Sequence, residues 1–178
     1  MNRRGLIILA AVFAALAIMA LIQNPAPPAL ETPPPVQRVF TDIGLTDIQA
    51  VRLRAPDGSR TFTMSRMDDG YWLAVDQEDQ IDQTSAENIV KTLVVLPYRR
   101  TLPLTAAVQL ADYGLRPVKN LAIEILLRNG QGHAVLVGDL SGTLTTYYAL
   151  VDNRAEIILI ERAPIDFLLT QFAALPLT

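Results

Sequence analysis

Very few residues of this chain could carry out catalysis or bind a metal. Among 178 residues there is no cysteine and only one histidine, His133. Without cysteine there can be no thiol catalysis, disulfide, iron–sulfur cluster or cysteine-ligated zinc, and a single histidine excludes sites built from several histidines. As a general base, His133 would need an orienting carboxylate and a nucleophile, and neither is evident beside it. We interpret it as a solvent-facing residue of a strand.

One loop is rich in carboxylates. It contains Asp76, Glu78, Asp79 and Asp82. Carboxylates gathered in this way can hold Ca²⁺, but the spacing is not that of an EF-hand and the central glycine is absent. We interpret the segment as a solvated acidic loop in which Asp82 or Thr84 caps the following helix.

Two further patterns bear on catalysis. The stretch Gly138-Asp139-Leu140-Ser141-Gly142 has glycines and a hydroxyl. It has no lysine and opens no helix, so it indicates a loop between strands and not a P-loop. A hydrolase built on Asp139 and Asp152 would need the two carboxylates to face one another about 5–9.5 Å apart. We rank that alternative last, and expect no catalytic residue, no metal and no cofactor.

The net charge is −3, from 15 basic and 18 acidic side chains. A nucleic-acid-binding protein needs a basic surface. The composition therefore argues against a nucleic-acid partner.

The N-terminal residues indicate a membrane anchor. Arg3 and Arg4 precede an uncharged run from Gly5 to Ile22, which as a helix would be about 27 Å long and span the hydrocarbon core. A cleaved signal peptide is the alternative, but its apolar region is usually only about 7–15 residues long. The two arginines favour a cytoplasmic N-terminus, so the chain is expected to be a single-pass protein of the cell membrane with its main domain on the extracytoplasmic, periplasmic side.

Small residues in the anchor could contact another transmembrane helix. They form two small-xxx-small pairs, Ala10 with Ala14 and Ala11 with Ala15. Such pairs let helices approach closely in lipid, although alanine is also common in anchors without partners.

A proline-rich stalk follows, from residue 23 to residue 37. It contains six of the twelve prolines. Proline favours extended polyproline II, so the stalk would be a semi-rigid spacer. Residues 38–178 are long enough for one domain with a core of its own.

The domain alternates strand patterns with turn signals. Turns are predicted at Asp57-Gly58, Asp68-Asp69-Gly70, Asn129-Gly130 and Asp152-Asn153. A capping box at Thr84 to Glu87 opens one helix that ends before Pro97, and a second helix follows Pro164. We therefore predict an α+β fold with antiparallel hairpins and two main helices.

The two halves of the domain, 38–100 and 118–178, show related patterns. A shift of 72 residues places Val51 on Ile123, Leu53 on Ile125 and Gly58 on Gly130. This suggests a duplicated strand–strand–strand–helix unit.

Six side chains of the domain are candidates for contact with a partner, because interfaces favour aromatic residues and arginine. They are Tyr71, Trp72, Arg99, Arg100, Tyr147 and Tyr148. Because side chains alternate along a strand, one of the two adjacent tyrosines should face the core and the other should face out.

Several short motifs resemble a known bacterial family. They are Leu110-Ala111-Asp112-Tyr113-Gly114-Leu115-Arg116-Pro117, Gly138-Asp139, Thr146-Tyr147-Tyr148-Ala149, and Asp152 before a strand rich in isoleucine. With the anchor and the Trp72 strand they resemble, over the whole chain, the family called domain of unknown function 4340. The sequence departs from the family pattern at Thr143 to Thr146 and at Asn153. The resemblance implies a membrane-anchored extracytoplasmic protein without established activity, of a kind sometimes found beside gliding-type ABC transporter components.

These observations predict a non-catalytic accessory or scaffold subunit of a larger membrane protein complex. The host would be an ABC-type transporter or an electron-transfer complex of a respiratory or photosynthetic membrane. Its partners would be other membrane subunits, contacted through the anchor and the domain, together with membrane lipid. The alternatives are a stand-alone extracytoplasmic module that binds a ligand or the cell wall and, last, the carboxylate-based hydrolase.

Overall fold

The computed structural model describes residues 35–75 and 81–174, which form an α+β domain, as predicted. The expected anchor, its alanine pairs and nearly all of the stalk lie outside these residues. No helix within the described ranges is long and apolar enough to cross a membrane.

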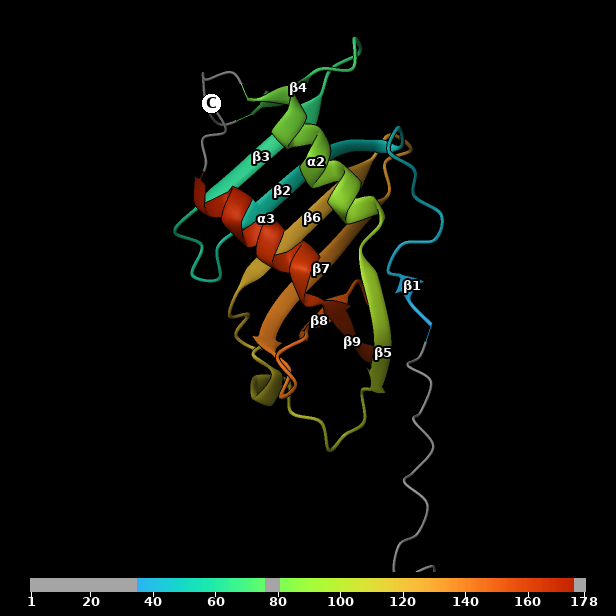
Figure 1. The fold of residues 1–178 in the computed structure, drawn as a ribbon, viewed down its shortest axis with the longest axis vertical. Coiled ribbons are helices and arrows are strands. Elements are labelled where there is room, and N and C mark those ends of the chain that lie inside the picture. Colours follow the sequence, from blue (N-terminus) through green and yellow to red (C-terminus); the bar gives the residue numbers. More distant parts are fainter. Residues whose placement is uncertain (1–34, 76–80, 175–178) are drawn as a thin grey trace, which may run out of the picture. The chain divides into compact units, whose positions relative to one another are not determined.

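A single nine-stranded antiparallel sheet forms the domain, with the strand order β1-β5-β9-β8-β7-β6-β2-β3-β4 (Figure 1). The strands are β1 (Gln37–Arg38), β2 (Ile48–Arg54), β3 (Thr61–Arg66), β4 (Trp72–Ala74), β5 (Pro97–Pro103), β6 (Leu121–Leu127), β7 (Gly132–Leu140), β8 (Thr146–Val151) and β9 (Glu156–Glu161). The predicted turns join neighbouring strands of this sheet. Gly58, Gly70 and Gly130 each have positive φ there, a conformation that glycine adopts without steric cost.

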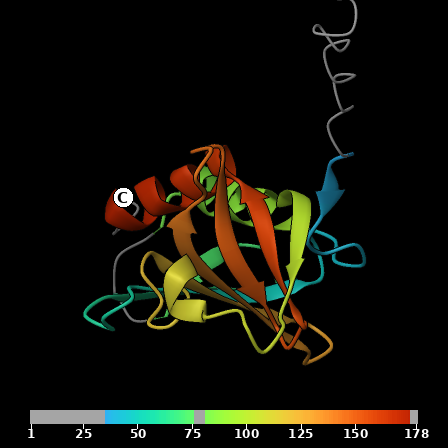
Figure 2. The same ribbon diagram turned by 90° about the horizontal axis from the view of Figure 1, so that it is seen from below.

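Two helices cover one face of the sheet, α2 (Gln83–Val94) and α3 (Arg162–Ala174) (Figure 1). The sheet bends around them (Figure 2). Helix α2 buries Ala86, Ile89, Val90 and Leu93, and α3 buries Ile165, Leu168 and Phe172. Both helices thus contribute to one core with the sheet face beneath them.

Both helices begin at residues other than those predicted. The cap of α2 is Asp82, whose carboxylate accepts from the N–H groups of Thr84 and Ser85, so the predicted capping box at Thr84 is wrong and the alternative cap is confirmed. An aspartate two positions earlier satisfies the free N–H groups equally well. Helix α3 begins at Arg162, which places Pro164 in the first turn, where proline fits because its missing N–H is not needed.

Strand β5 was not predicted, because prolines occupy both of its ends and two arginines its middle. It pairs with β9 on one side and, for two residues only, with β1 on the other. Strand β7 also extends further than expected. It includes Gly138, Asp139 and Leu140, so the predicted inter-strand loop over Gly138–Gly142 is wrong for its first three residues.

Strand β4 forms the edge of the sheet opposite β1, and a side chain binds the backbone groups of its residue Trp72. The Gln83 side-chain carbonyl accepts from the Trp72 N–H at 2.8 Å, and its amide nitrogen donates to the Trp72 carbonyl at 2.9 Å. Gln83 therefore pairs with this edge residue as a neighbouring strand would. Edge groups left open are a common cause of aggregation.

Candidate functional site

The single histidine has a carboxylate partner. His133 Nδ1 lies 2.8 Å from Asp152 Oδ2, although 19 residues separate the two along the chain. The His133 side chain is 26% exposed and its ring packs edge-on against Phe40, with centroids 5.3 Å apart. The prediction of a solvent-facing histidine is therefore wrong: His133 lies on the helix-covered side of β7, opposite Ile125. Its second ring nitrogen, Nε2, has no hydrogen-bond partner within the described part of the chain.

Backbone geometry holds Asp152 in place. It lies in the β8–β9 turn with a φ of 51°, a left-handed conformation that aspartate tolerates better than most residues. Its Oδ1 accepts from the Ala134 N–H at 2.7 Å, and its own N–H donates to the Ala134 carbonyl at 2.8 Å. The Asp152 backbone and carboxylate are thus each held by a hydrogen bond with Ala134, and the carboxylate orients the imidazole.

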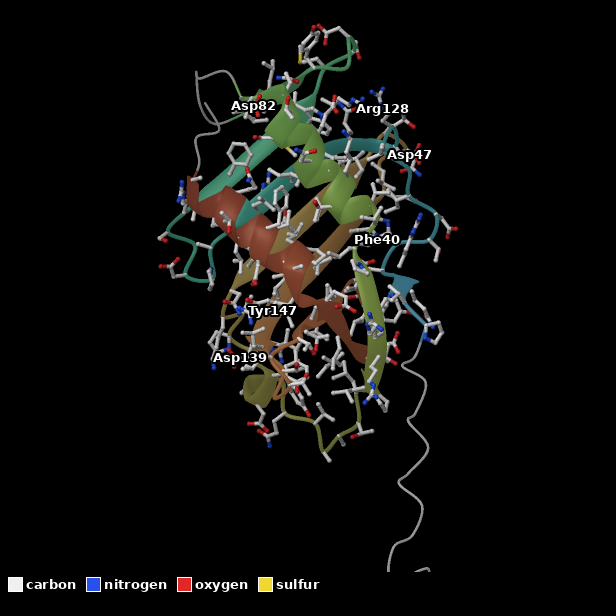
Figure 3. All side chains as sticks on the ribbon, in the orientation of Figure 1. Phe40, Asp47, Asp82, Arg128, Asp139 and Tyr147 are labelled. Carbon is white, nitrogen blue, oxygen red and sulfur yellow. The ribbon has the colours of Figure 1, made fainter. Side chains whose placement is uncertain are left out.

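A hollow of about 340 Å³ opens beside His133. It lies between the segment 40–47, the β6–β7 turn and the start of β9. Its lining combines aromatic and aliphatic groups with both signs of charge: Phe40, Thr41, Asp42, Ile43, Asp47, Leu127, Arg128, Asn129, Gln131, His133 and Arg154. Figure 3 shows Phe40, Asp47 and Arg128 along the same side of the domain. Sequence reasoning missed this site.

The two arginines of the hollow are positioned by backbone carbonyls. Arg128 Nε donates to the Thr46 carbonyl at 2.9 Å, and Arg154 Nη2 donates to the Val39 carbonyl at 2.7 Å. Within the described ranges neither guanidinium has a carboxylate partner. A guanidinium has five N–H donors, so each retains donors for a bound molecule.

A second, shallower hollow of about 590 Å³ lies on the sheet face away from the helices. Arg52 and Glu124 form an ion pair of 3.0 Å within it. Strand register places Leu73, Ser65, Ala50, Leu126 and Gly132 in one row across five strands beside that pair. The row consists of apolar and small side chains, and its two leucines are 45% and 44% exposed.

The aromatic candidates divide between core and surface. Trp72 is 2% exposed, so the exposed aromatic residue beside β4 is Tyr71, at 61%. Tyr147 faces the core and Tyr148 the opposite side, as the alternation predicted. The Arg99 Nε donates to Glu161 on the neighbouring strand, whereas Arg100 is exposed.

Tyr147 belongs to a polar network at the start of α3. Its hydroxyl donates to Asp166 Oδ1 at 2.8 Å, and Arg162 Nε donates to Asp166 Oδ2 at 2.8 Å. Burial, then the hydrogen bond to Asp166 and its negative charge, raise the pKa of Tyr147. Burial alone would raise the pKa of Asp166, but hydrogen bonds from Arg162 and Tyr147 and the Arg162 charge outweigh it, so this pKa is lowered. The network ties β8 to α3.

Arg162, the first residue of α3, also binds the exposed loop between β7 and β8. Leu144 is 60% exposed and has a φ of 58°, an uncommon conformation for leucine. Its N–H donates to the Ser141 carbonyl at 2.9 Å, and its carbonyl accepts from Arg162 at 3.3 Å.

Three of the motifs that carry the family resemblance lie together: the segment around Tyr113, Gly138-Asp139 and the strand with Tyr148. The Tyr113 and Tyr148 rings meet edge-on, with centroids 4.8 Å apart. A Cβ on Gly114 would lie 2.8 Å from the Asp139 backbone nitrogen, and a Cβ on Gly138 would overlap the Tyr113 carbonyl oxygen. Glycine at both positions thus allows the segment around Tyr113 to touch the end of β7.

The two carboxylates of the hydrolase alternative do not face each other. Asp139 binds Lys119 Nζ at 2.7 Å near the end of β7, whereas Asp152 binds His133 near its start. Six residues of strand separate these positions, or about 20 Å. That is well beyond the separation this chemistry requires.

In the acidic loop, Asp76, Glu78 and Asp79 lie outside the described residues. Asp82 caps α2, and hydrogen bonds with Ser85 lower its pKa. The described part of the chain holds no group of three metal-ligating side chains.

The pairing of His133 with Asp152 could not be read from the sequence, because it depends on the register of β7 against β8. The turn signal at Asp152-Asn153 was the one available hint. In comparisons with known proteins, no protein-family model, curated protein or solved structure matches the chain.

Proposed function

We propose that the domain is a non-catalytic binding module, held at the extracytoplasmic side of a membrane by its N-terminal segment, and that it serves as an accessory subunit of a larger membrane protein complex. The observation that carries the proposal is the row of small and apolar side chains, with its two exposed leucines, on the sheet face away from the helices. A monomeric domain would normally cover or interrupt such a row.

Further apolar side chains lie along the edge strand β4, at one end of the row. Tyr71, Leu73 and Val75 alternate along β4 and its ends and therefore share this face, and Val75 is 59% exposed. Leu126 extends the row to β6. Charged groups border it, since Arg52 and Arg54 both approach Glu124, at 3.0 and 3.8 Å. An apolar centre with a charged margin is the usual composition of a protein interface.

The anchor supports a membrane location. The uncharged run from Gly5 to Ile22 is long enough to cross a bilayer, and the arginines before it favour a cytoplasmic N-terminus. The proline-rich stalk would hold the domain away from the lipid, and the alanine pairs would let the anchor pack against another helix. The host complex we propose is an ABC-type transporter, as the family resemblance implies, or an electron-transfer complex.

We also propose that the domain arose by duplication, with a repeat of 72 residues. Strands β2 and β6 are antiparallel neighbours, and Arg52 pairs with Glu124, 72 residues further along. The same shift relates Val51 to Ile123 and Leu53 to Ile125. It therefore converts the cross-strand pair Val51–Ile125 into the cross-strand pair Leu53–Ile123. A local two-fold axis through the Arg52–Glu124 pair accounts for both relations, and the hairpins β2–β3 and β6–β7 extend outward from it.

Affinity purification tests the accessory role. The full chain with a C-terminal tag is extracted from native membranes in mild detergent, and the co-eluting proteins are identified. We expect stoichiometric recovery with a set of membrane subunits. A lone monomer in mild detergent would overturn the proposal.

A matched pair of variants tests which surface binds. Leu73→Glu places a charge in the apolar row, and Val95→Glu places the same charge on an apolar residue of comparable exposure, 48% against 45%, after α2. We expect the first variant to lose the partners and the second to retain them. Equal recovery with both variants would show that the row is not the interface.

The alternative of a ligand-binding module is favoured by a separate observation, the hollow beside His133. Its polar groups converge from three segments on a concave surface, which is the usual anatomy of a small-molecule site.

A further inference from the structure

We infer that the hollow beside His133 binds a small zwitterion of the amino-acid type, held by its carboxylate and its ammonium group. This inference does not rest on the accessory role, because it concerns another surface and would hold for a domain acting alone. Four features of the hollow carry it: two guanidinium groups, two carboxylates, an aromatic floor and a fixed imidazole.

The guanidinium groups supply the carboxylate-binding side. Arg128 follows β6 and Arg154 precedes β9, so two different turns bring them to one hollow. Each is anchored through a single nitrogen, to the Thr46 and the Val39 carbonyl, respectively. Arginine pairs with carboxylates through two parallel N–H donors, and such bonds are about twice as strong as neutral ones. Their anchored geometry leaves these donors for a ligand.

The acidic side chains supply the opposite charge. Asp42 and Asp47 line the same hollow. Asp47 Oδ2 accepts from the Gly44 N–H at 2.8 Å, and the Asp42 carboxylate has no partner within the described ranges. Neither carboxylate lies within 4.0 Å of a guanidinium nitrogen of residues 35–75 or 81–174. A simple anion would be attracted by the arginines and repelled by the aspartates. A zwitterion can pair its carboxylate with the arginines and its ammonium group with the aspartates.

The floor of the hollow is apolar. Phe40 is 4% exposed, and Leu127 and Ile43 lie beside it. The volume of about 340 Å³ is at the lower end of small-ligand sites, which range from about 300 to 1,000 Å³. An amino acid with an apolar side chain combines this size with the required charges.

The imidazole of His133 is oriented before any ligand binds. Asp152 holds Nδ1, and Asp152 is itself held by two hydrogen bonds with Ala134 in a left-handed backbone conformation. Strained residues of this kind concentrate at binding and catalytic sites. Nε2 has no hydrogen-bond partner among the residues that the structure describes, so His133, which lines the hollow, offers it as a fixed hydrogen-bonding group.

Calorimetry on the full chain in nonionic detergent tests the inference. The probes are glycine, L-leucine and L-phenylalanine, together with N-acetyl-L-leucine, which lacks the ammonium, and L-leucinamide, which lacks the carboxylate. We expect saturable binding of leucine or phenylalanine, and at least about tenfold weaker binding of each blocked derivative, which corresponds to about 1.4 kcal/mol.

Variants assign each charge to its side of the ligand. Asp42→Asn should remove the preference for L-leucine over N-acetyl-L-leucine, because the ammonium loses its partner. Arg128→Gln and Arg154→Gln should remove the preference for L-leucine over L-leucinamide, because the carboxylate loses its partners. Arg116→Gln is the matched control, because this exposed arginine lies in the loop before β6 and away from the hollow. A change in discrimination, with the melting curve unchanged, separates a binding role from a folding defect.

Three results would overturn the inference. The first is no saturable heat from any of the three amino acids up to about 10 mM, beyond the millimolar range of weak specific ligands. The second is equal affinity for leucine and its blocked derivatives. The third is an effect of Arg116→Gln as large as that of Arg154→Gln.

Discussion

The contact between the segment around Tyr113 and the end of β7 can be tested with four glycine-to-alanine variants. A methyl group on Gly138 would overlap the Tyr113 carbonyl oxygen and lie 3.0 Å from Leu115. Because the obstacle is backbone, the overlap cannot be relieved by a rotamer change. Overpacking usually costs about 1–3 kcal/mol, and we expect Gly138→Ala to reach the upper end, about 3 kcal/mol.

The other three glycines separate the steric effect from the backbone effect. Gly142 has open space around it, so Gly142→Ala should be neutral or stabilising by up to about 0.5 kcal/mol. Gly130 also has open space, but its φ is +83°, so alanine there should cost about 1 kcal/mol. Gly114 combines a φ of +65° with a Cβ position 2.8 Å from the Asp139 nitrogen. Its replacement should cost as much as that of Gly138 or more.

Urea unfolding followed by fluorescence measures these differences, because the single tryptophan is buried. With an m-value of about 2 kcal/mol per molar urea, a loss of 3 kcal/mol lowers the midpoint by about 1.5 M. Domains of this kind are stable by about 5–15 kcal/mol, so Gly138→Ala should still fold. If its midpoint equals that of Gly142→Ala, the two segments do not approach as closely as described. If Gly114→Ala costs no more than Gly130→Ala, the contact with Asp139 is not tight.

Three further changes give independent checks by the same unfolding assay. Gln83→Leu keeps the side-chain size but leaves the Trp72 N–H and carbonyl unpaired, so we expect a loss of about 1–3 kcal/mol and more aggregation; an unchanged midpoint would show that the edge needs no cover. Leu144→Asn should raise the free energy of unfolding by about 1 kcal/mol, because asparagine adopts positive φ more readily; a lower value would contradict the assigned strain. The pKa of Asp166 is lowered in the folded state. Its contribution to the free energy of unfolding is therefore present above the pKa of the unfolded state and is lost as pH falls through the pKa of the folded state. Asp166→Asn should therefore flatten the stability curve below about pH 4, and an unchanged acid slope would refute the assignment.

Much of the fold could be predicted because local signals determine it. Glycines at residues 58, 70 and 130 mark three of the hairpin turns, and each has the positive φ that the turn requires. The apolar periodicity from Ala86 to Leu93 specifies the buried side of α2. These features depend on neighbours within a few residues, so the sequence is sufficient to reveal them.

The missed features depend on contacts between distant segments. Strand β5 has prolines at both ends and pairs with β9, about 60 residues later, so nothing in its own composition marks it as a strand. His133 meets Asp152 because β7 and β8 pair in one register, and it meets Phe40 because the chain enters the domain beside them. The candidate site is assembled from such contacts, and local patterns therefore could not reveal it.

The path of the segment from β4 to β5 has a consequence for the halves of the domain. Strand β4 forms one edge of the sheet, α2 runs from it across the covered face, and β5 pairs with β9 near the other edge (Figure 1). The end of the first half, continued to Pro103, therefore supplies a strand to the second half. Residues 118–178 expressed alone would leave the side of β9 unpaired, so separate production of the halves should give an aggregating fragment. Under the proposed duplication, an ancestor with one unit would have needed a second copy to complete its sheet, and fusion of the two copies would have made that partnership permanent.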